Sequence, residues 1–357
     1  MPTFDAETDG VKTECSVPSE IKALAAQAEY VLYFYNGRFL SEPSQSVQDL
    51  ALTVKPLVSA QSRVEHQGAF VKIAKTNGPT VKIAVIHLYG NALGADMQQP
   101  FSTGTHNTYF FGPNSQAEIF EAHFAANSIE FVARNISDFV LDAQAKASVV
   151  QVIWPGIDAS IENQVQGQLK SNANLQFLNC SLRGKSIHND ISIRLCESGA
   201  STSLMNLCRA DNSSQTTHVT FINHEVGETQ SCQTSRNVLT DSARVIFNGK
   251  LLIAQNAQKS EAHQMVKSLL LSDQAQVEAQ PQLEVFADDV KASHGATVGQ
   301  IDVEELFYLQ SRGLSQERAA QMLALGFQQA LIEKIKAPFL REAIRETLGR
   351  CVDGCVP

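Results

Sequence analysis

The chain has 357 residues, of which 43% are hydrophobic and only 18% are charged. Its formal net charge is −9 and it has no run of Lys or Arg, which argues against a nucleic-acid-binding protein, because such proteins need a basic surface to neutralise phosphates. No segment approaches the roughly 18 consecutive apolar residues of a membrane-spanning helix, so we expect no association with a membrane.

The N-terminal sequence and the cysteines predict a cytoplasmic location. The first ten residues contain Asp and Glu where a secretory signal peptide carries basic residues. Seven cysteines, an odd number in a long chain, are expected to be reduced thiols rather than a disulfide framework. The spacing of Cys351 and Cys355 fits no strong zinc pattern, so we expect this pair to lie in an ordinary C-terminal tail.

Residues 1–80 are predicted to form a short N-terminal segment containing a helix and a hairpin. Ser19 is a suitable N-cap for a helix over residues 20–27. Two apolar runs, 31–35 and 38–40, flank Asn36-Gly37, a pair that supplies the positive φ angles of a type I′ hairpin turn.

Residues 81–301 are predicted to form a long series of short strands. Clusters of Asn, Asp, Gly and Ser occur roughly every 8–12 residues, a spacing typical of a β-sandwich, a barrel or a β-solenoid. The series is too long for an immunoglobulin-like sandwich of roughly 100 residues, and no strict repeat decides among the other architectures. The predicted strands cover residues 81–86, 117–124, 128–132, 138–141, 148–153, 175–178, 187–195, 203–207, 218–222, 244–247 and 251–253.

Helical periodicity begins at about residue 302 and predicts a C-terminal helical domain over 302–357. A first helix over 303–312 ends at Gly313, a natural left-handed cap, and Ser315 can cap a second helix to about residue 336. Pro338 ends this helix, and a third covers 339–350. Such a domain is expected to cap the open edge of the sheets or to bind a partner.

No residue pattern by itself demands an enzyme. The chain lacks the P-loop, dinucleotide-binding, zinc-protease and serine-hydrolase motifs. His218 and His224 are expected to be solvated or hydrogen-bonded core residues rather than metal ligands. Asp288-Asp289 is expected to accept turn hydrogen bonds rather than to serve as a glycosidase pair.

The most distinctive segment is PQLEVFADDVKASHGATVGQID, residues 281–302. Its first half alternates as a strand, and Ser293-His294-Gly295 is predicted to form a tight turn at the end of that strand. The segment resembles the signature of the SufB/SufD family of iron–sulfur cluster assembly proteins, on the SufD side. The resemblance continues through residues 35–39, 243–250, 268–273 and 306–313.

The resemblance implies a mainly β fold, a right-handed parallel β-helix with a short N-terminal α/β segment and a C-terminal helical domain. It implies a non-catalytic subunit of a scaffold complex that pairs with a SufB-like paralogue and binds the SufC ATPase, which alone would bind ATP. No cofactor would be stably bound, and iron or an iron–sulfur cluster would be held transiently at the SufB interface. His294 would be the metal ligand there, unless it is only a turn residue with a structural hydrogen bond. The interface strand would contain Val285, Ala287 and Lys291, and the ATPase-docking region would contain Leu306, Phe307, Tyr308, Leu309, Arg312 and Gly313.

Two departures from the family pattern qualify these expectations. Ala292 stands where SufD proteins commonly have a cysteine, so no thiolate at that position can bind metal. The only tryptophan is Trp154, so the N-terminal R-x-E-x-W-x-Y-T pattern of long SufD proteins is missing and an abbreviated N-terminal domain is expected. Two alternatives stay open: a SufB-like scaffold that forms a homodimer, and a β-helix enzyme acting on polysaccharide. A homodimer is also possible for the chain in isolation from its partners.

Overall fold

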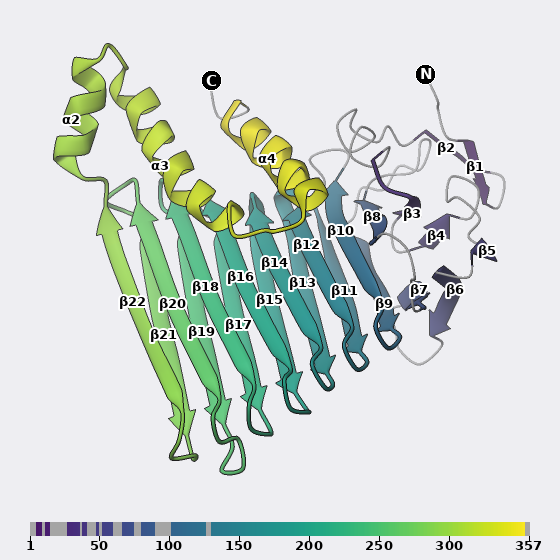
Figure 1. Cartoon of the computed structure of the whole chain (residues 1–357). Coiled ribbons are helices and arrows are strands. Elements are labelled where there is room, and N and C mark those ends of the chain that lie inside the picture. The colour runs from purple at the N-terminus through teal and green to yellow at the C-terminus, as the bar shows by residue number, and fades with distance from the viewer. Residues whose placement is uncertain are drawn as a thin grey trace.

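Parallel pairing between alternate strands organises the structure. This computed structural model describes residues 5–8, 11–14, 27–35, 38–40, 48–49, 52–59, 66–74, 80–89, 101–125 and 130–353. From β8 to β22 the strands alternate between two sheets, and each pairs in parallel with the next strand of its own sheet (Figure 1). The chain therefore coils as a β-solenoid of about seven turns, each of about 30 residues. The predicted mainly β fold and parallel β-helix are confirmed.

The strands divide between two ten-stranded sheets and a separate antiparallel pair, β1 (Asp5–Thr8) with β2 (Val11–Glu14). The first sheet contains, in spatial order, β22 (Lys291–Gln300), β20 (Glu261–Leu270), β18 (Gln230–Leu239), β16 (Ser201–Ala210), β14 (Asn174–Leu182), β12 (Lys146–Trp154), β10 (Gln116–Ala125), β8 (Val81–Tyr89), β3 (Tyr30–Tyr35) and β4 (Arg38–Leu40). The second sheet contains β21 (Gln276–Val285), β19 (Arg244–Ile253), β17 (Gln215–His224), β15 (Gly184–Leu195), β13 (Gly156–Leu169), β11 (Phe131–Leu141), β9 (Phe101–Phe111), β7 (His66–Ile73), β6 (Leu52–Ser59) and β5 (Gln48–Asp49).

Stacked turns join the sheets, and their residues adopt the left-handed conformation that such turns require. Asn114 and Asn172 have φ angles of 60° and 54°, which asparagine tolerates better than most residues. Gly199 occupies the corresponding place in a later turn, with φ of 77°. A Cβ atom there would lie 2.2 Å from the side-chain oxygen of Asn172 in the turn below, so only glycine fits.

Strand alternation separates an interior between the two sheets from their outer faces. In β11 every second residue is buried, and the residues between them are exposed or half-buried. Large rings fill part of the interior, where Tyr109 and Phe139 stack with centroids 4.8 Å apart and Phe177 meets Phe139 edge-on. Polar side chains, many of them asparagine, fill another part of the interior.

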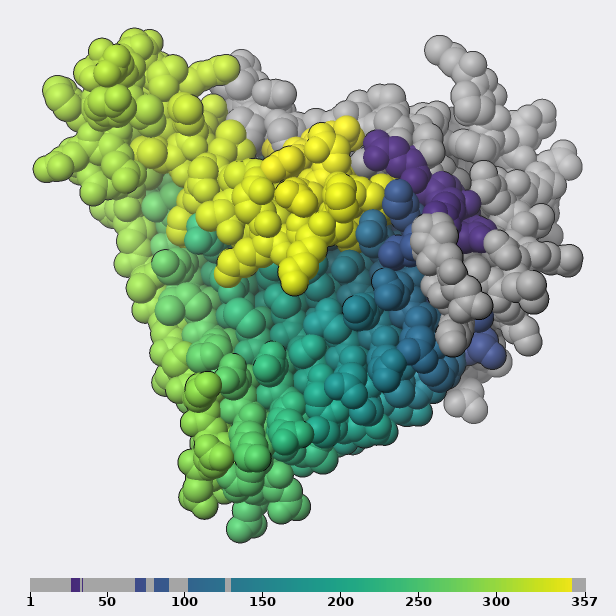
Figure 2. Space-filling view, in the orientation of Figure 1, coloured from purple at the N-terminus to yellow at the C-terminus, as the bar shows by residue number. Residues whose placement is uncertain are grey.

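Three helices follow the last strand: α2 (Val303–Ser311), α3 (Gln316–Ile332) and α4 (Pro338–Asp353). The end of α3 and all but the C-terminal end of α4 lie across the outer face of the first sheet (Figures 1 and 2). Leu331, Leu340 and Ile344 are buried there against Phe120 and Val150 of the sheet. The helices thus cover a sheet face, and the expectation that they cap the open edge of the sheets is wrong.

The predicted helix ends are partly confirmed. Gly313 has the left-handed φ of 93°, and the Ser315 hydroxyl accepts a hydrogen bond from the amide of Arg318. Helix α3 ends at Ile332 rather than near residue 336, and Pro338 begins α4, because the first turn of a helix tolerates a residue without an amide hydrogen.

The N-terminal hairpin is confirmed by the antiparallel pairing of β3 with β4. Its turn residues, the predicted helix over 20–27 and Cys355 lie outside the described residues. Cys351 falls within α4 rather than in a tail beyond it.

His218 and His224 are buried core residues, which was one of the two environments expected for them. Both ring nitrogens of His224 lie 2.7 Å from hydroxyl groups, of Thr229 and Ser231. His218 lies 3.4 Å from the amide nitrogen of Asn189. Burial lowers the pKa of each histidine to about 4.

We expect these two histidines to make the fold sensitive to mild acid. Their folded pKa values lie below the unfolded value of 6.5, so their contribution is complete above pH 6.5 and is lost as the pH falls towards 4. Between pH 7 and pH 5 each should cost about 2 kcal/mol of unfolding free energy. Denaturant titrations should show a smaller acid loss in His218→Gln than in the wild type. The exposed control His263→Gln should behave as the wild type, and an equal loss in all three would contradict the assignment.

Candidate functional site

The two last strands, β21 and β22, form the open end of the solenoid. Each pairs with only one neighbouring strand, so its outer edge has no strand beside it among the described residues (Figure 1). An uncovered sheet edge carries unpaired backbone donors and acceptors and is a template for pairing with another chain.

Interior side chains are uncovered at this end. Val285 is in register with the buried Ile253, and Val298 with the buried Ser268, so both belong to the interior face of the last turn. They are nevertheless 39% and 50% exposed, because no further turn covers them. Phe286, directly after β21, is also exposed. The end of the solenoid is therefore apolar at its centre and polar at its backbone edges, a combination suited to a protein partner.

His294 lies on the same interior face, in the middle of β22. Its register partner is Gln264, whose own partner is the buried Gln233. The ring nitrogen Nδ1 of His294 lies 3.1 Å from the carbonyl oxygen of Pro281 in β21. A carbonyl only accepts hydrogen bonds, so Nδ1 donates, and Nε2 of the neutral ring carries a free lone pair. The fold thus leaves the His294 ring oriented by its own chain and able to bind a metal.

The predicted Ser-His-Gly turn is wrong. Residues 291–300 pair with β20 along their whole length, so Ser293 and Gly295 are strand residues. The preceding strand ends at Val285 rather than at Lys291. The pairing energy of a complete parallel ladder overrides the weak strand preference of a segment rich in Ala, Ser and Gly.

The other residues assigned to the interface strand differ in their surroundings. Ala287 is buried in the connection between β21 and β22, where it packs against the interior core. Lys291 is exposed at the start of β22 and forms an ion pair with Glu261 at 2.7 Å. Ala292 faces the interior two residues from His294, where a cysteine would have stood beside the imidazole.

The described residues give His294 no complete set of metal ligands. Among the described residues, no group of three His, Cys, Asp or Glu ligand atoms gathers around it. His263, in the neighbouring strand, is exposed and its Nδ1 lies 2.8 Å from the Ser293 hydroxyl, one residue before His294 and on the opposite face. The described residues therefore do not complete a metal site at His294.

Helix α2, which has no buried residue, carries four of the six residues assigned to ATPase docking, and Arg312 and Gly313 follow it directly. Phe307 is 70% exposed, and Tyr308 is exposed with the guanidinium of Arg312 packed over its ring. Leu306 and Leu309 are half-buried, and Gly313 begins the turn into α3. The helix extends from the solenoid beside the open end, free of the sheet face that α4 covers (Figure 1).

An arginine anchors α3 to the solenoid close to this helix. The guanidinium of Arg236 in β18 lies 4.8 Å from the ring centroid of Phe327 and donates a hydrogen bond to the Phe327 carbonyl oxygen. Because Arg236 is buried in part, burial lowers its pKa, yet the group stays cationic at any physiological pH. These contacts tie the second half of α3 to β18.

Sequence reasoning missed part of this site. Phe286 and Val298 were not predicted, because their importance follows from lying where the stacking of turns ends. Their only signal in the sequence is a large apolar residue within an otherwise small or polar segment.

Comparison with known proteins identifies the family. Residues 95–327 match the model of the "SUF system FeS cluster assembly, SufBD core domain". Iron–sulfur cluster assembly protein SufD of Escherichia coli (strain K12) is 39% identical over 135 residues, which cover 38% of this chain and 32% of that protein. SufD of Bacillus subtilis (strain 168) is 36% identical over 115 residues, covering 32% and 26%. A SufBD family protein of Mycobacterium leprae (strain TN) is 26% identical over 215 residues, covering 58% and 55%.

The matched segments span about a third or less of the two SufD proteins. No helix in the described part of the chain is long and apolar enough to cross a membrane. The family match covers most of the solenoid and the helices α2 and most of α3, and it includes His294 and the open end. The chain therefore belongs to the SufBD family of iron–sulfur cluster assembly proteins.

Proposed function

We propose that this chain is a non-catalytic scaffold subunit that pairs with a SufB-like paralogue through the open end of its solenoid. The exposure of interior side chains at that end is the observation that carries the proposal. A structurally similar solenoid, docked end to end, would cover Val285 and Val298 and pair the free edges of β21 and β22.

The pairing would place His294 at the junction between the two chains. Its lone pair on Nε2 would supply one ligand to iron or to a nascent cluster, which is cargo rather than a resident cofactor. The remaining ligands would come from the paralogue, since Ala292 offers no thiolate. Imidazole suits iron, so a shared site of this kind is chemically reasonable.

The ATPase of the system, a SufC-type protein, would dock on α2 and the start of α3. Exposed aromatic and aliphatic residues on a short helix are typical of helix-in-groove recognition. ATP would be bound and hydrolysed by that partner, in agreement with the missing P-loop in this chain.

Substitution at the open end tests the pairing. In co-expression with the SufB-like paralogue, we expect Val298→Asp to weaken the heterodimer at least about tenfold, because the partner would have to bury an unpaired carboxylate. Val132→Asp is the matched control, since Val132 is a comparably exposed valine on β11, away from the open end. Analytical ultracentrifugation of both complexes measures the difference.

Equal pairing of Val298→Asp and Val132→Asp would contradict the proposal. The SufB-like homodimer is the alternative that the same surface favours, because an open end can also pair with a second copy. It predicts that the wild-type chain associates with itself as tightly as with the paralogue, whereas the proposal predicts a clear preference for the paralogue.

A further inference from the structure

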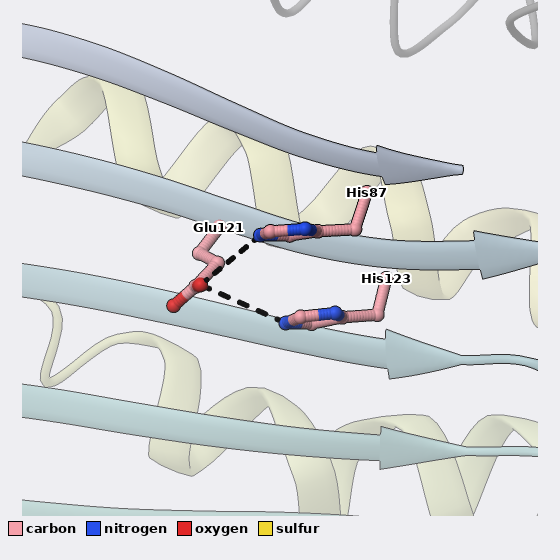
Figure 3. Close-up of side chains that lie close together, drawn as sticks. All are labelled: His87, Glu121 and His123. Atoms are coloured by element: carbon pink, nitrogen blue, oxygen red, sulfur yellow. Dashed lines mark ion pairs between the residues drawn. The ribbon is translucent and has the colours of Figure 1, made fainter. Parts of the chain in front are cut away.

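A cluster of three buried ionisable side chains lies in the first turns of the solenoid, far from the open end. His87 is on β8, and Glu121 and His123 are on β10. Parallel pairing sets His87 directly beside His123, and strand alternation turns Glu121 to the same interior face as His123. All three are fully buried (Figure 3). These are the only described residues that bring three such candidate ligand atoms together.

The three candidate ligand atoms face one another. Nε2 of His87 lies 3.3 Å from Oε1 of Glu121, and Nε2 of His123 lies 3.7 Å from the same oxygen (Figure 3). All three atoms lie within 4.8 Å of one another. In a tetrahedral zinc site, bonds of about 2.0–2.1 Å place neighbouring ligand atoms about 3.4 Å apart. A small closure would therefore bring the atoms to bonding distance of one ion.

The hydrogen bonds around His123 show which of its ring nitrogens carries the lone pair. The Tyr89 hydroxyl donates its single proton to Oδ1 of Asn135, at 2.9 Å. Its oxygen therefore accepts from Nδ1 of His123, at 3.0 Å. The other nitrogen, Nε2, carries the lone pair, has no hydrogen-bond partner and is buried.

Asn107 contacts both His87 and Glu121. The backbone amide of Ala69 donates to Oδ1 of Asn107, so the amide group of Asn107 presents its two protons to the cluster. One points to Nε2 of His87, at 3.2 Å, and the other to Oε1 of Glu121, at 3.1 Å. An amide group only donates, so Nε2 of His87 accepts from Asn107 when the ring carries its proton on Nδ1, the tautomer that metal binding through Nε2 requires. In that tautomer two nitrogen lone pairs converge on one carboxylate.

Further hydrogen-bond donors stabilise the carboxylate of Glu121 as an anion. The amide of Gln151 donates to Oε2 of Glu121 at 3.1 Å, and the Ser137 hydroxyl lies 3.3 Å from both oxygens. A buried anion that faces two lone pairs is costly unless a cation lies among them.

We propose that His87, Glu121 and His123 bind one divalent first-row transition-metal ion, Zn²⁺ or Fe²⁺, inside the solenoid. Two imidazoles and one carboxylate are a preferred donor set for both ions, and the hydrogen bonds that Tyr89 accepts from His123 and that Glu121 accepts from its neighbours are the outer contacts that orient such ligands. The imidazole rings now stack in parallel, 4.3 Å apart and 4° from coplanar orientation. Because each lone pair lies in its ring plane, metal binding tilts the two rings towards each other.

This site is separate from the transient site proposed at His294. It lies several turns away along the solenoid, it needs no second chain, and its closed surroundings suit a resident ion that is captured as the chain folds. A variant that lacks this site can still be tested for pairing with the paralogue, so the two proposals are tested independently.

Metal content of the full-length chain tests the proposal. The chain is refolded with Zn²⁺, or with Fe²⁺ under anaerobic conditions, then passed through gel filtration and analysed by mass spectrometry for bound metal. We expect about one ion per chain in the wild type, retained on incubation with a weak chelator. His87→Gln and His123→Gln should lower the content at least tenfold. His224→Gln, which removes another buried imidazole with both nitrogens satisfied, should retain the full content.

A second measurement covers the case in which the variants fail to fold. The visible spectrum of the Co²⁺-loaded wild-type chain should show the bands of nitrogen and oxygen ligands. A strong sulfur-to-cobalt charge-transfer band would assign the ion to cysteines instead and overturn the proposal. It would also be overturned by a wild type that binds neither ion, or by cluster variants that bind as much as His224→Gln. Competition between the two ions decides which one the site prefers.

Discussion

Phe307→Asp is expected to abolish stable binding of a SufC-type ATPase to this chain, with a loss of at least about 100-fold in affinity. Aromatic residues at the centre of an interface commonly contribute about 2–4 kcal/mol to binding, and a buried aspartate adds a desolvation cost. The residue is 70% exposed on a helix with no buried side chain, so the substitution should leave the melting temperature unchanged. Isothermal titration of the purified ATPase into each chain measures the effect.

Ile157→Asp provides the control, because Ile157 is an exposed aliphatic residue on β13, far along the solenoid from α2. Unaltered binding by Phe307→Asp would remove α2 from the docking surface. Deleting the whole C-terminal region from residue 303 is a poorer test. Such a deletion would uncover Phe120 and Val150, which Leu331, Leu340 and Ile344 now bury.

His294→Ala is expected to leave the heterodimer intact but to reduce the iron and sulfide of the reconstituted complex at least about tenfold. One exposed ligand adds little to a large interface. Removal of a metal ligand, by contrast, leaves a coordination position that water fills poorly. The measurement is the iron and sulfide content, with the absorbance of the cluster, in co-purified complexes.

His263→Ala is the matched control for this experiment. It removes an exposed imidazole from the neighbouring strand, but from the opposite face. His294→Cys, which replaces the nitrogen ligand with a thiolate, should restore part of the cluster. If His294→Ala holds as much iron and sulfide as His263→Ala, then the bond to Pro281 is a structural contact only.

Local sequence signals predicted those parts of the fold that local forces determine. The hairpin of β3 and β4, the cap at Ser315 and the left-handed Gly313 each depend on a few neighbouring residues. Apolar strands such as β8 and β12 were also found from the sequence, because their buried faces are hydrophobic.

Strands with polar interiors escaped sequence analysis. β13 and β18 bury Asn163, Gln233 and Asn237, which in isolation resemble turn residues. They are stable as strands because amides from successive turns bond to one another, as Asn163 does to Asn189. The two runs predicted at 244–247 and 251–253 are a single strand, β19, because Asn248 and Gly249 pair with both neighbouring strands.

The candidate sites were still harder to predict from the sequence, because they depend on how the turns of the solenoid stack. His294 was found by resemblance, but its conformation was predicted wrongly, because a ladder with β20 replaces the turn that its neighbours favour. His87, Glu121 and His123 were not singled out, since only the register of β8 with β10 brings them together. The alternation Glu121-x-His123 within an apolar strand was the one local signal for that cluster.

Hydrogen exchange of β21 and β22 tests the central claim most directly, namely that the open end of the solenoid is the pairing surface. Mass spectrometry would compare the chain alone with its complex with the SufB-like paralogue. We predict strong slowing of exchange in residues 276–300 on complex formation, because the free edges of both strands gain hydrogen-bond partners. The middle turns, such as β13 and β14, should be unaffected. Unchanged exchange in residues 276–300, with protection elsewhere on the solenoid, would contradict the account.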